Sequence, residues 1–247
     1  MQNITTVALS RLAAQERAID VAATNMANTA TPGFQAERMV FADWLVRQPG
    51  GGQPPGGAVI SYTQDRATYR DTRPGPLTHT GNPLDLAIGV SDGFFTVQTQ
   101  RGVRLTRAGH FELSASGTIV DGNGNALLDT QGRPIQAAPT DAGFSITGDG
   151  TISGDSGRIG RIAIVRPPDA QSLRPEGNRL FTADKPTTAV DTPAIVQGAI
   201  EDSNVQPVTE MTRMMTELRT YQFVSQFVQS ESERQQTTID KLTQKRP

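Results

Sequence analysis

The chain has 247 residues, and its 23 lysines and arginines nearly balance its 25 aspartates and glutamates, leaving a net charge of −2. That balance excludes the strong global field that would attract nucleic acid or an anionic membrane. Because the chain has no cysteine, disulfides, thiolate zinc sites and a cysteine nucleophile are excluded as well. No apolar stretch approaches the roughly 20 residues of a membrane helix, and the N-terminal residues lack the pattern of a cleaved secretory signal. We therefore expect no membrane insertion and, if the protein leaves the cytoplasm, another export route.

Residues 1–28 are predicted to form one helix, because apolar or small side chains recur at steps of three, four and seven. That narrow stripe, which Gln15 interrupts, consists of Met1, Ile4, Ala8, Leu12, Ile19, Ala22 and Met26. Asn28 is expected to end the helix in a left-handed conformation. Pro32 and Gly33 then predict a type II turn, in which the glycine takes a positive φ.

The middle of the chain differs from its ends. Residues 49–57 are so rich in glycine and proline that we expect a flexible excursion inside an extended arm formed by residues 35–75. Residues 76–204 hold short alternating runs separated by turn residues, a pattern typical of an all-β domain. The predicted strands are 85–90, 94–99, 103–106, 110–113, 118–120, 126–128, 144–147 and 161–166.

A second long helix is predicted for residues 207–245, since Pro207 suits a first helical turn and no glycine follows. A heptad count gives one seam position at Met211, Leu218, Ser225, Ser232 and Ile239, and the other at Met214, Tyr221, Val228, Gln235 and Leu242. Neither terminal helix has a stripe wide enough to be stable alone, so each needs a partner. An intramolecular hairpin of the two helices is one possibility; pairing within a larger assembly is the favoured one.

A search for chemistry yields little. His79 is read as a loop residue and His110 as a strand residue, because no nucleophile motif accompanies either. The segment 121–125 imitates the start of a calcium loop, but the required glycine and glutamate are missing, so a tight hairpin is expected. Glu201 is read as an ordinary surface carboxylate. We therefore expect no catalytic, cofactor-binding or metal-binding residues and no small-molecule substrate.

Four blocks of sequence together resemble the axial proteins of the bacterial flagellar rod and hook. They are residues 25–34 (NMANTATPGF), residues 85–95 with 106–111 (TRAGHF), residues 198–205 (GAIEDSNV), and Arg219 with Tyr221. The blocks occur in the order that this family shows and extend over nearly the whole chain.

The resemblance implies a mostly β fold with α-helical termini that pair in a coiled-coil-like core. Residues 1–34 with 205–247 would form that core, residues 35–75 the arm, and residues 76–204 an outer β domain. The implied assembly residues are Asn25, Ala27, Asn28, Thr31, Pro32, Gly33, Phe34, Ser203, Asn204, Val205, Met211, Met214, Leu218, Arg219 and Tyr221. The implied β-domain motif residues are Gly93, Phe94, Phe95, Thr106, Arg107, Gly109 and Phe111.

The implied function is that of a structural rod subunit in the periplasmic part of the basal body. Its partners would be other rod subunits and the flagellar type III export apparatus. The stretch 203–212, with Pro207 and Val208, resembles the proximal-rod members more than the distal-rod members. A distal-rod subunit remains one alternative, and a cell-wall hydrolase or binding domain remains another.

Overall fold

The computed structural model describes residues 2–47, 59–138, 141 and 143–243. The chain divides into two compact units. A helical unit comprises Met1–Ala27, Glu37–Tyr69 and Gln206–Pro247, and a β unit comprises Asn28–Ala36 and Arg70–Val205. Residues 28–36, most of which the sequence groups with the terminal helices, thus pack within the β unit. The expected flexible excursion at residues 49–57 lies outside the described residues.

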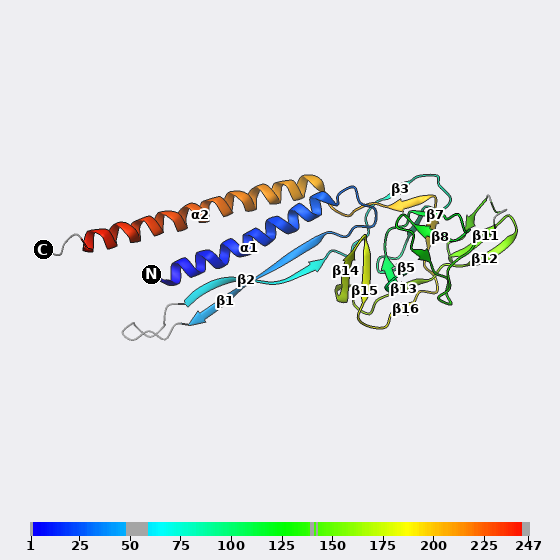
Figure 1. Ribbon diagram of the computed structural model, residues 1–247, viewed down its shortest axis with the longest axis horizontal. Helices are drawn as coiled ribbons and strands as arrows, with labels where there is room; N and C mark the ends of the chain where they lie inside the picture. The colour runs from blue at the N-terminus through cyan, green and yellow to red at the C-terminus, as the bar shows by residue number, and fades with distance from the viewer. Residues whose placement is uncertain (1, 48–58, 139–140, 142, 244–247) are drawn as a thin grey trace. The chain divides into compact units, whose positions relative to one another are not determined.

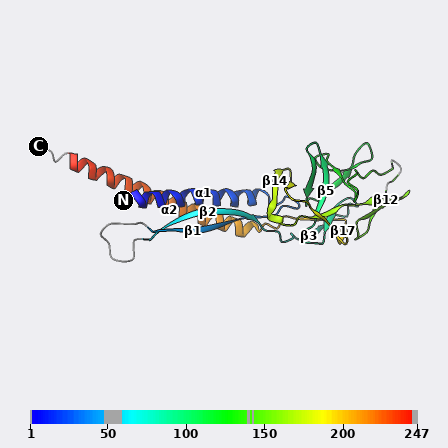
Figure 2. The same ribbon diagram turned by 90° about the horizontal axis from the view of Figure 1, so that it is seen from below.

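Two antiparallel helices form the helical unit together with a two-stranded ribbon. The helices are α1, Gln2–Ala27, and α2, Pro207–Thr243, and they pack side by side (Figure 1). The strands β1, Glu37–Arg47, and β2, Val59–Arg70, pair with each other, and β1 contacts α1 (Figure 2). The intramolecular helix pair, left open by the sequence, is therefore present.

The buried face of α1 is made of small and polar side chains. Ala8, Ala14, Ala18 and Ala22 are all buried, whereas the larger Leu12, Ile19 and Met26 of the predicted stripe are half-buried. Gln15, predicted to interrupt the stripe, lies within the buried face and is 7% exposed. Small residues let two helices approach closely, but they remove little apolar surface from water.

The face of α2 that packs inward follows a heptad, although not the predicted one. Its buried and half-buried positions include Glu210, Met214, Glu217, Tyr221, Val224, Val228, Glu231 and Gln235. The predicted position that includes Met214, Tyr221, Val228 and Gln235 therefore coincides with this face. The other predicted position is wrong, because Met211, Leu218, Ser225, Ser232 and Ile239 are all exposed. The residues that pack at this level instead lie one position earlier, and most of them are acidic: Glu210, Glu217, Val224 and Glu231.

The β unit contains sixteen short strands, counted within the described residues. They are β3 Leu77–His79, β4 Leu86–Ile88, β5 Phe94–Thr99, β6 Gly102–Thr106, β7 Phe111–Leu113, β8 Ile119–Asp121, β9 Ala126–Leu127, β10 Ser145–Ile146, β11 Thr151–Gly154, β12 Gly157–Arg161, β13 Ile164–Arg166, β14 Leu173–Gly177, β15 Leu180–Ala183, β16 Thr188–Ala189, β17 Ile195–Gln197 and β18 Ala199–Glu201. A short 3-10 helix, Ala170–Ser172, precedes β14.

One sheet organises this unit. Its main path is β14-β15-β6-β5-β9-β8-β7, and β13 joins it by pairing with β5 and β16. Smaller sheets pair β10-β11-β12, β17 with β4, and β18 with β3. The core beneath them gathers Phe95, Val97, Phe111, Leu127 and Ile152, each almost fully buried. All eight predicted strands are present, and the mostly β fold with helical ends is confirmed.

None of the helices in the described part of the chain combines the length and apolar character needed to cross a membrane.

Candidate functional site

The turn after α1 is held by backbone bonds and by a close approach within the β unit. The amide of Phe34 donates to the carbonyl of Thr31 at 3.2 Å, and Gly33 has a φ of +70°, as predicted from Pro32 and Gly33. The amide of Gly33 donates to the carbonyl of Glu201 at 2.7 Å. A Cβ atom on Gly33 would lie 2.6 Å from the carbonyl carbon of Arg107, so there is no room for a side chain.

Beneath this turn, a buried ion pair joins two distant segments. Arg107 Nε donates to Glu201 Oε2 at 2.7 Å, and the two side chains are 0% and 3% exposed. Arg107 Nη1 also donates to the carbonyls of Gly93 and Ser91. We call Gly33, Gly93, Arg107 and Glu201 the Arg107 cluster. The interpretation of Glu201 as a surface carboxylate was wrong. The motif residue Arg107 could have indicated the role of Glu201, because a buried cation requires a buried anion nearby.

Asn204 ties three segments of the β unit together. Its side-chain oxygen accepts from the amide of Ala36 at 2.7 Å, and its side-chain amide donates to the carbonyls of Asp71 and Arg73 at 2.8 and 2.7 Å. Its backbone amide donates to the carbonyl of Phe34 at 3.2 Å. Because the side-chain oxygen accepts one bond and both hydrogens of the side-chain amide are donated, no other side chain of this size could replace it. Its neighbours Ser203 and Val205 are buried.

The remaining β motif residues are core residues. Phe95 packs edge-on against Phe111 with ring centroids 5.2 Å apart, and Phe94 packs similarly against Phe181 at 5.9 Å. A Cβ atom on Gly109 would lie 1.6 Å from the carbonyl oxygen of Leu86. Thr106 is also buried, and its hydroxyl accepts from the amide of Ala108 at 3.1 Å. These motif residues therefore shape the β unit.

A second buried polar cluster lies in the helical unit. Asn25 exchanges two bonds of 2.8 Å with the backbone of Glu37, and its amide also donates to Glu210 Oε2 at 3.3 Å. Arg38 forms an ion pair with the other oxygen of Glu210, whose side chain is 0% exposed. We call Asn25, Glu37, Arg38 and Glu210 the Asn25 cluster. It fixes the last turn of α1 against the first turn of α2 and the start of β1.

The resemblance named Asn25 as an assembly residue, but the sequence offered no sign of its two charged partners. Arg38 and Glu210 carry no periodic or motif signal, since each looks like an ordinary exposed charge. The predicted left-handed Asn28 is wrong, because its φ is not positive. The carbonyl of Asn28 instead accepts from the amide of Thr31 at 3.2 Å, which turns the chain without a left-handed residue. Ala27 is exposed and Pro32 is half-buried.

Large apolar side chains lie on the part of α2 that faces away from α1. Val208, Met211, Met215 and Leu218 are 79%, 49%, 51% and 39% exposed, and their spacing of three, four and three residues places them in one line. We call these four residues the outer stripe. Phe223 and Phe227 are exposed on another side of the helix, and Arg219 is exposed as well. Of the predicted assembly residues on α2, Met211 and Leu218 thus point away from α1, whereas Met214 and Tyr221 belong to the inner seam.

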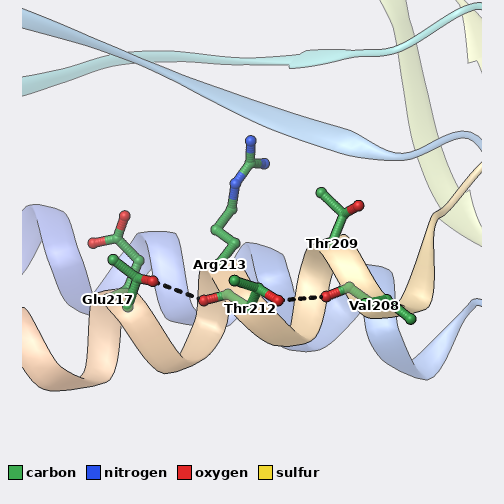
Figure 3. Close-up of a pocket in the computed structure, with 6 residues that line it drawn as sticks. Val208, Thr209, Thr212, Arg213 and Glu217 are labelled. Carbon is green, nitrogen blue, oxygen red and sulfur yellow. Dashed lines mark hydrogen bonds between the residues drawn. The ribbon is translucent and has the colours of Figure 1, made fainter.

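A groove of about 440 Å³ follows the first turns of α2 (Figure 3). It is lined by Val208, Thr209, Thr212, Arg213, Thr216 and Glu217. The hydroxyl of Thr212 donates to the carbonyl of Val208, and that of Thr216 to the carbonyl of Thr212, each at 2.8 Å. Because these hydroxyls are already bonded within the helix, this part of α2 offers a partner a largely apolar surface.

The residues considered for chemistry have structural partners. His110 Nδ1 lies 2.6 Å from Asp85 Oδ1, and buried Asp85 also accepts from the hydroxyl of Thr80 at 2.6 Å. His79, predicted to lie in a loop, instead ends strand β3 and is exposed. Asp121 caps the predicted hairpin by accepting from two backbone amides. Among the described residues, no group of three or more histidine, cysteine or acidic side chains is placed to hold a metal ion.

Three family profiles match successive parts of the chain. "Flagella basal body rod protein" matches residues 6–35, "Flagellar hook protein FlgE/F/G D1 domain" matches 87–154, and "Flagellar basal body rod FlgEFG protein C-terminal" matches 196–241. These ranges contain the Gly33 turn, Arg107, and Glu201 with Asn204.

Curated relatives match over almost the whole length. The flagellar basal-body rod protein FlgF of Caulobacter vibrioides is 34% identical, with 98% of each chain covered. FlgF of Mesorhizobium japonicum is 33% identical over 90% of each chain. The rod protein FlgG of Bacillus subtilis is 34% identical over 87% of this chain and 89% of its own. The chain therefore belongs to the family of flagellar basal-body rod proteins, whose members are structural subunits of the basal body and not enzymes.

Proposed function

We propose that this chain is a subunit of the proximal rod, where it polymerises with itself and with neighbouring axial proteins and transmits torque across the periplasm. The proximal assignment is supported by the full-length similarity to FlgF proteins and by the Pro207-Val208 pair that opens α2. Assembly with other rod or axial proteins follows from family membership.

The observation that carries the proposal is the two-sided character of α2. Its inner seam packs on α1, while the outer stripe of Val208, Met211, Met215 and Leu218 stays exposed in the single chain. A surface helix that remains apolar on a second side requires a second partner. Fully burying one such side chain is worth about 1.5–3 kcal/mol, so completing the burial of four half-exposed ones offers on the order of 4 kcal/mol per subunit. Repeated along a polymer, that contribution favours assembly.

Torque transmission requires units that do not deform, and the two buried polar clusters supply that property. The Arg107 cluster lies within the β unit and the Asn25 cluster within the helical unit. Buried networks whose members are hydrogen-bonded hold a single arrangement, because every alternative leaves a charge without its partner. Each unit is therefore suited to pass on force as a rigid part.

Delivery of the subunit is proposed to use the flagellar type III export apparatus. The absence of cysteine suits a chain that must remain free of disulfides until it reaches the periplasm. The proposal includes no nucleic-acid partner, no membrane insertion and no cofactor or small-molecule substrate. The near-neutral net charge of −2 supports the first of these, and the lack of an apolar stretch of about 20 residues supports the second.

The test replaces one residue of the outer stripe. Met215→Asp places a carboxylate where a partner helix would pack, and we expect the variant to fold normally but to be missing from purified basal bodies. Thr238→Asp is the control, since Thr238 is exposed on the same helix and, 23 residues beyond Met215, lies on a different side of it from the stripe. We expect the control to be incorporated. Normal incorporation of Met215→Asp, together with normal motility, would refute the proposal.

A distal-rod subunit is the second candidate, because FlgG of Bacillus subtilis is as similar, at 34% identity, as the FlgF relatives. The two positions are separable by copy number and order. Quantitative mass spectrometry of basal bodies would give the copy number, and cross-linking to neighbouring rod proteins would show whether the chain lies in the proximal or the distal rod. A subunit that cross-links to hook-side proteins and not to base-side proteins would favour the distal rod.

A further inference from the structure

Gln15 occupies an unusual place in the helix pair. It lies in the buried face of α1, one heptad from Ala8 and one from Ala22, and is 7% exposed. Its side-chain oxygen is fully buried and accepts no hydrogen bond from any described residue. A buried acceptor that gives up water without gaining a partner destabilises the packed state. A leucine or methionine of similar size would carry no such penalty.

The opposite helix does not provide a donor at this level. The bond between Asn25 and Glu210 fixes the antiparallel register, so Gln15, ten residues before Asn25, lies at the level of Thr220 and Tyr221. The hydroxyl of Thr220 already donates to the carbonyl of Thr216 at 2.9 Å. The side chain that best matches the height of Gln15 is therefore committed to its own helix.

The rest of the seam contributes little free energy to offset this penalty. The buried residues of α1 around Gln15 are alanines, and Val224 is the apolar residue of α2 that is buried at the seam. Alanines remove little apolar area from water, so the free energy that closes the pair is small. At the far end, the Asn25 cluster holds the first turn of α2 regardless of what happens at Gln15.

We propose that Gln15 is a weak point built into the α1–α2 pair. In a free subunit its unpaired oxygen keeps the packed helix pair in equilibrium with an open state, in which α1 and α2 separate around Gln15. The Asn25 cluster meanwhile holds the last turn of α1 against the first turn of α2. Burial of the outer stripe by neighbouring copies then supplies the free energy that closes the pair. The assembly half of this inference rests on the proposed rod function, whereas the weak point itself is a property of the single chain.

Amide hydrogen exchange of the purified full-length subunit tests the weak point. Gln15→Leu removes the unpaired acceptor, and we expect amide exchange across the seam of α1 to slow about tenfold or more, with no change in the β unit. Gln15→Met, which is unbranched, guards against a misfit of the leucine shape and should give the same protection. Gln226→Leu makes an equivalent change at an exposed position of α2 and should leave exchange unchanged. Exchange at the wild-type rate or faster in both Gln15 variants would overturn the inference.

Incorporation into basal bodies tests the assembly half separately. The assembly half takes the open subunit as the form that joins the polymer, so cells producing Gln15→Leu should incorporate fewer copies than wild type, at equal subunit levels. Incorporation equal to wild type, despite slower exchange in the free subunit, would overturn that half. Failure of the wild-type chain itself to appear in basal bodies would instead count against the proposed function, and the exchange result would stand independently.

Discussion

Gly33 permits a sharp test of why the turn after α1 contains glycine. Two separate costs are expected for Gly33→Ala. The positive φ of +70° penalises any side chain by about 1–2 kcal/mol. The new Cβ atom would also lie 2.6 Å from the carbonyl carbon of Arg107, and relieving such overpacking costs roughly another 1–3 kcal/mol. We therefore expect the β unit to lose about 2–5 kcal/mol of unfolding free energy.

Two other glycines of the β unit separate these costs. Gly81 has a φ of +76°, and a Cβ atom added there would meet nothing within 4 Å, so Gly81→Ala reports the backbone penalty alone. Gly109 has no positive φ, but its Cβ atom would lie 1.6 Å from the carbonyl oxygen of Leu86, so Gly109→Ala reports the clash alone. The assay is urea unfolding of the full chain followed by circular dichroism. If Gly33→Ala proves no more destabilising than Gly81→Ala, the close approach to Arg107 has no energetic weight and our reasoning fails.

Three further predictions concern the β unit. Arg107→Met should destabilise it by about 3–5 kcal/mol, because Glu201 is left buried without a cation. Adding Glu201→Gln should restore part of this loss. If the losses of the two substitutions simply add in urea unfolding, the two residues are not a coupled pair. Ala194→Gly should stabilise it by about 1 kcal/mol, because Ala194 has a φ of +52°; a lower melting temperature would show that this strain is not real. Hydrogen bonds from the Thr147 hydroxyl, and then from the hydroxyl and backbone amide of Thr151, lower the pKa of Asp149 from 3.8 to about 2. The stabilisation from this carboxylate is therefore present above pH 3.8 and is lost as the pH falls toward 2. Thr147→Val should raise that pKa in an NMR titration, and an unchanged pKa would rule out the hydroxyl as its cause.

The features that sequence reasoning located depend on local chemistry. The Gly33 turn follows from the conformational preferences of two adjacent residues, and strands such as Phe94–Thr99 follow from alternation over a few positions. The strands that it missed lack that alternation. β14, with the sequence LRPEG, and β12, with GRIGR, are edge strands that pair with the strand next to them in the sequence, β15 and β11. Because most of their side chains are exposed or half-buried, and edge strands tolerate proline and glycine, their pairing leaves no alternating pattern in the sequence.

The errors at the candidate site share one physical cause. Counting a heptad from Met211 assumes that the most apolar residues of α2 face its partner helix. In the structure the seam begins at Glu210, because Asn25 and Arg38 stabilise that carboxylate from other elements. The same reasoning hid Glu201, whose partner Arg107 lies 94 residues away in sequence. Buried charge depends on pairs that a single sequence does not display.

The unequal lengths of the two helices have a mechanical consequence. At 1.5 Å per residue, α1 with 26 residues is about 39 Å long, and α2 with 37 residues is about 55 Å long. Because Asn25 and Glu210 align their neighbouring ends, the excess of α2 projects past the start of α1, as Figure 1 shows, and Ile239 in this projection is 54% exposed. In the rod assembly proposed above, subunits with such uneven ends would overlap lengthwise, so a pull along the rod would be borne as shear by many side-chain contacts at once. Separation would then require whole helices to slide past one another, which is far harder than parting two flat faces.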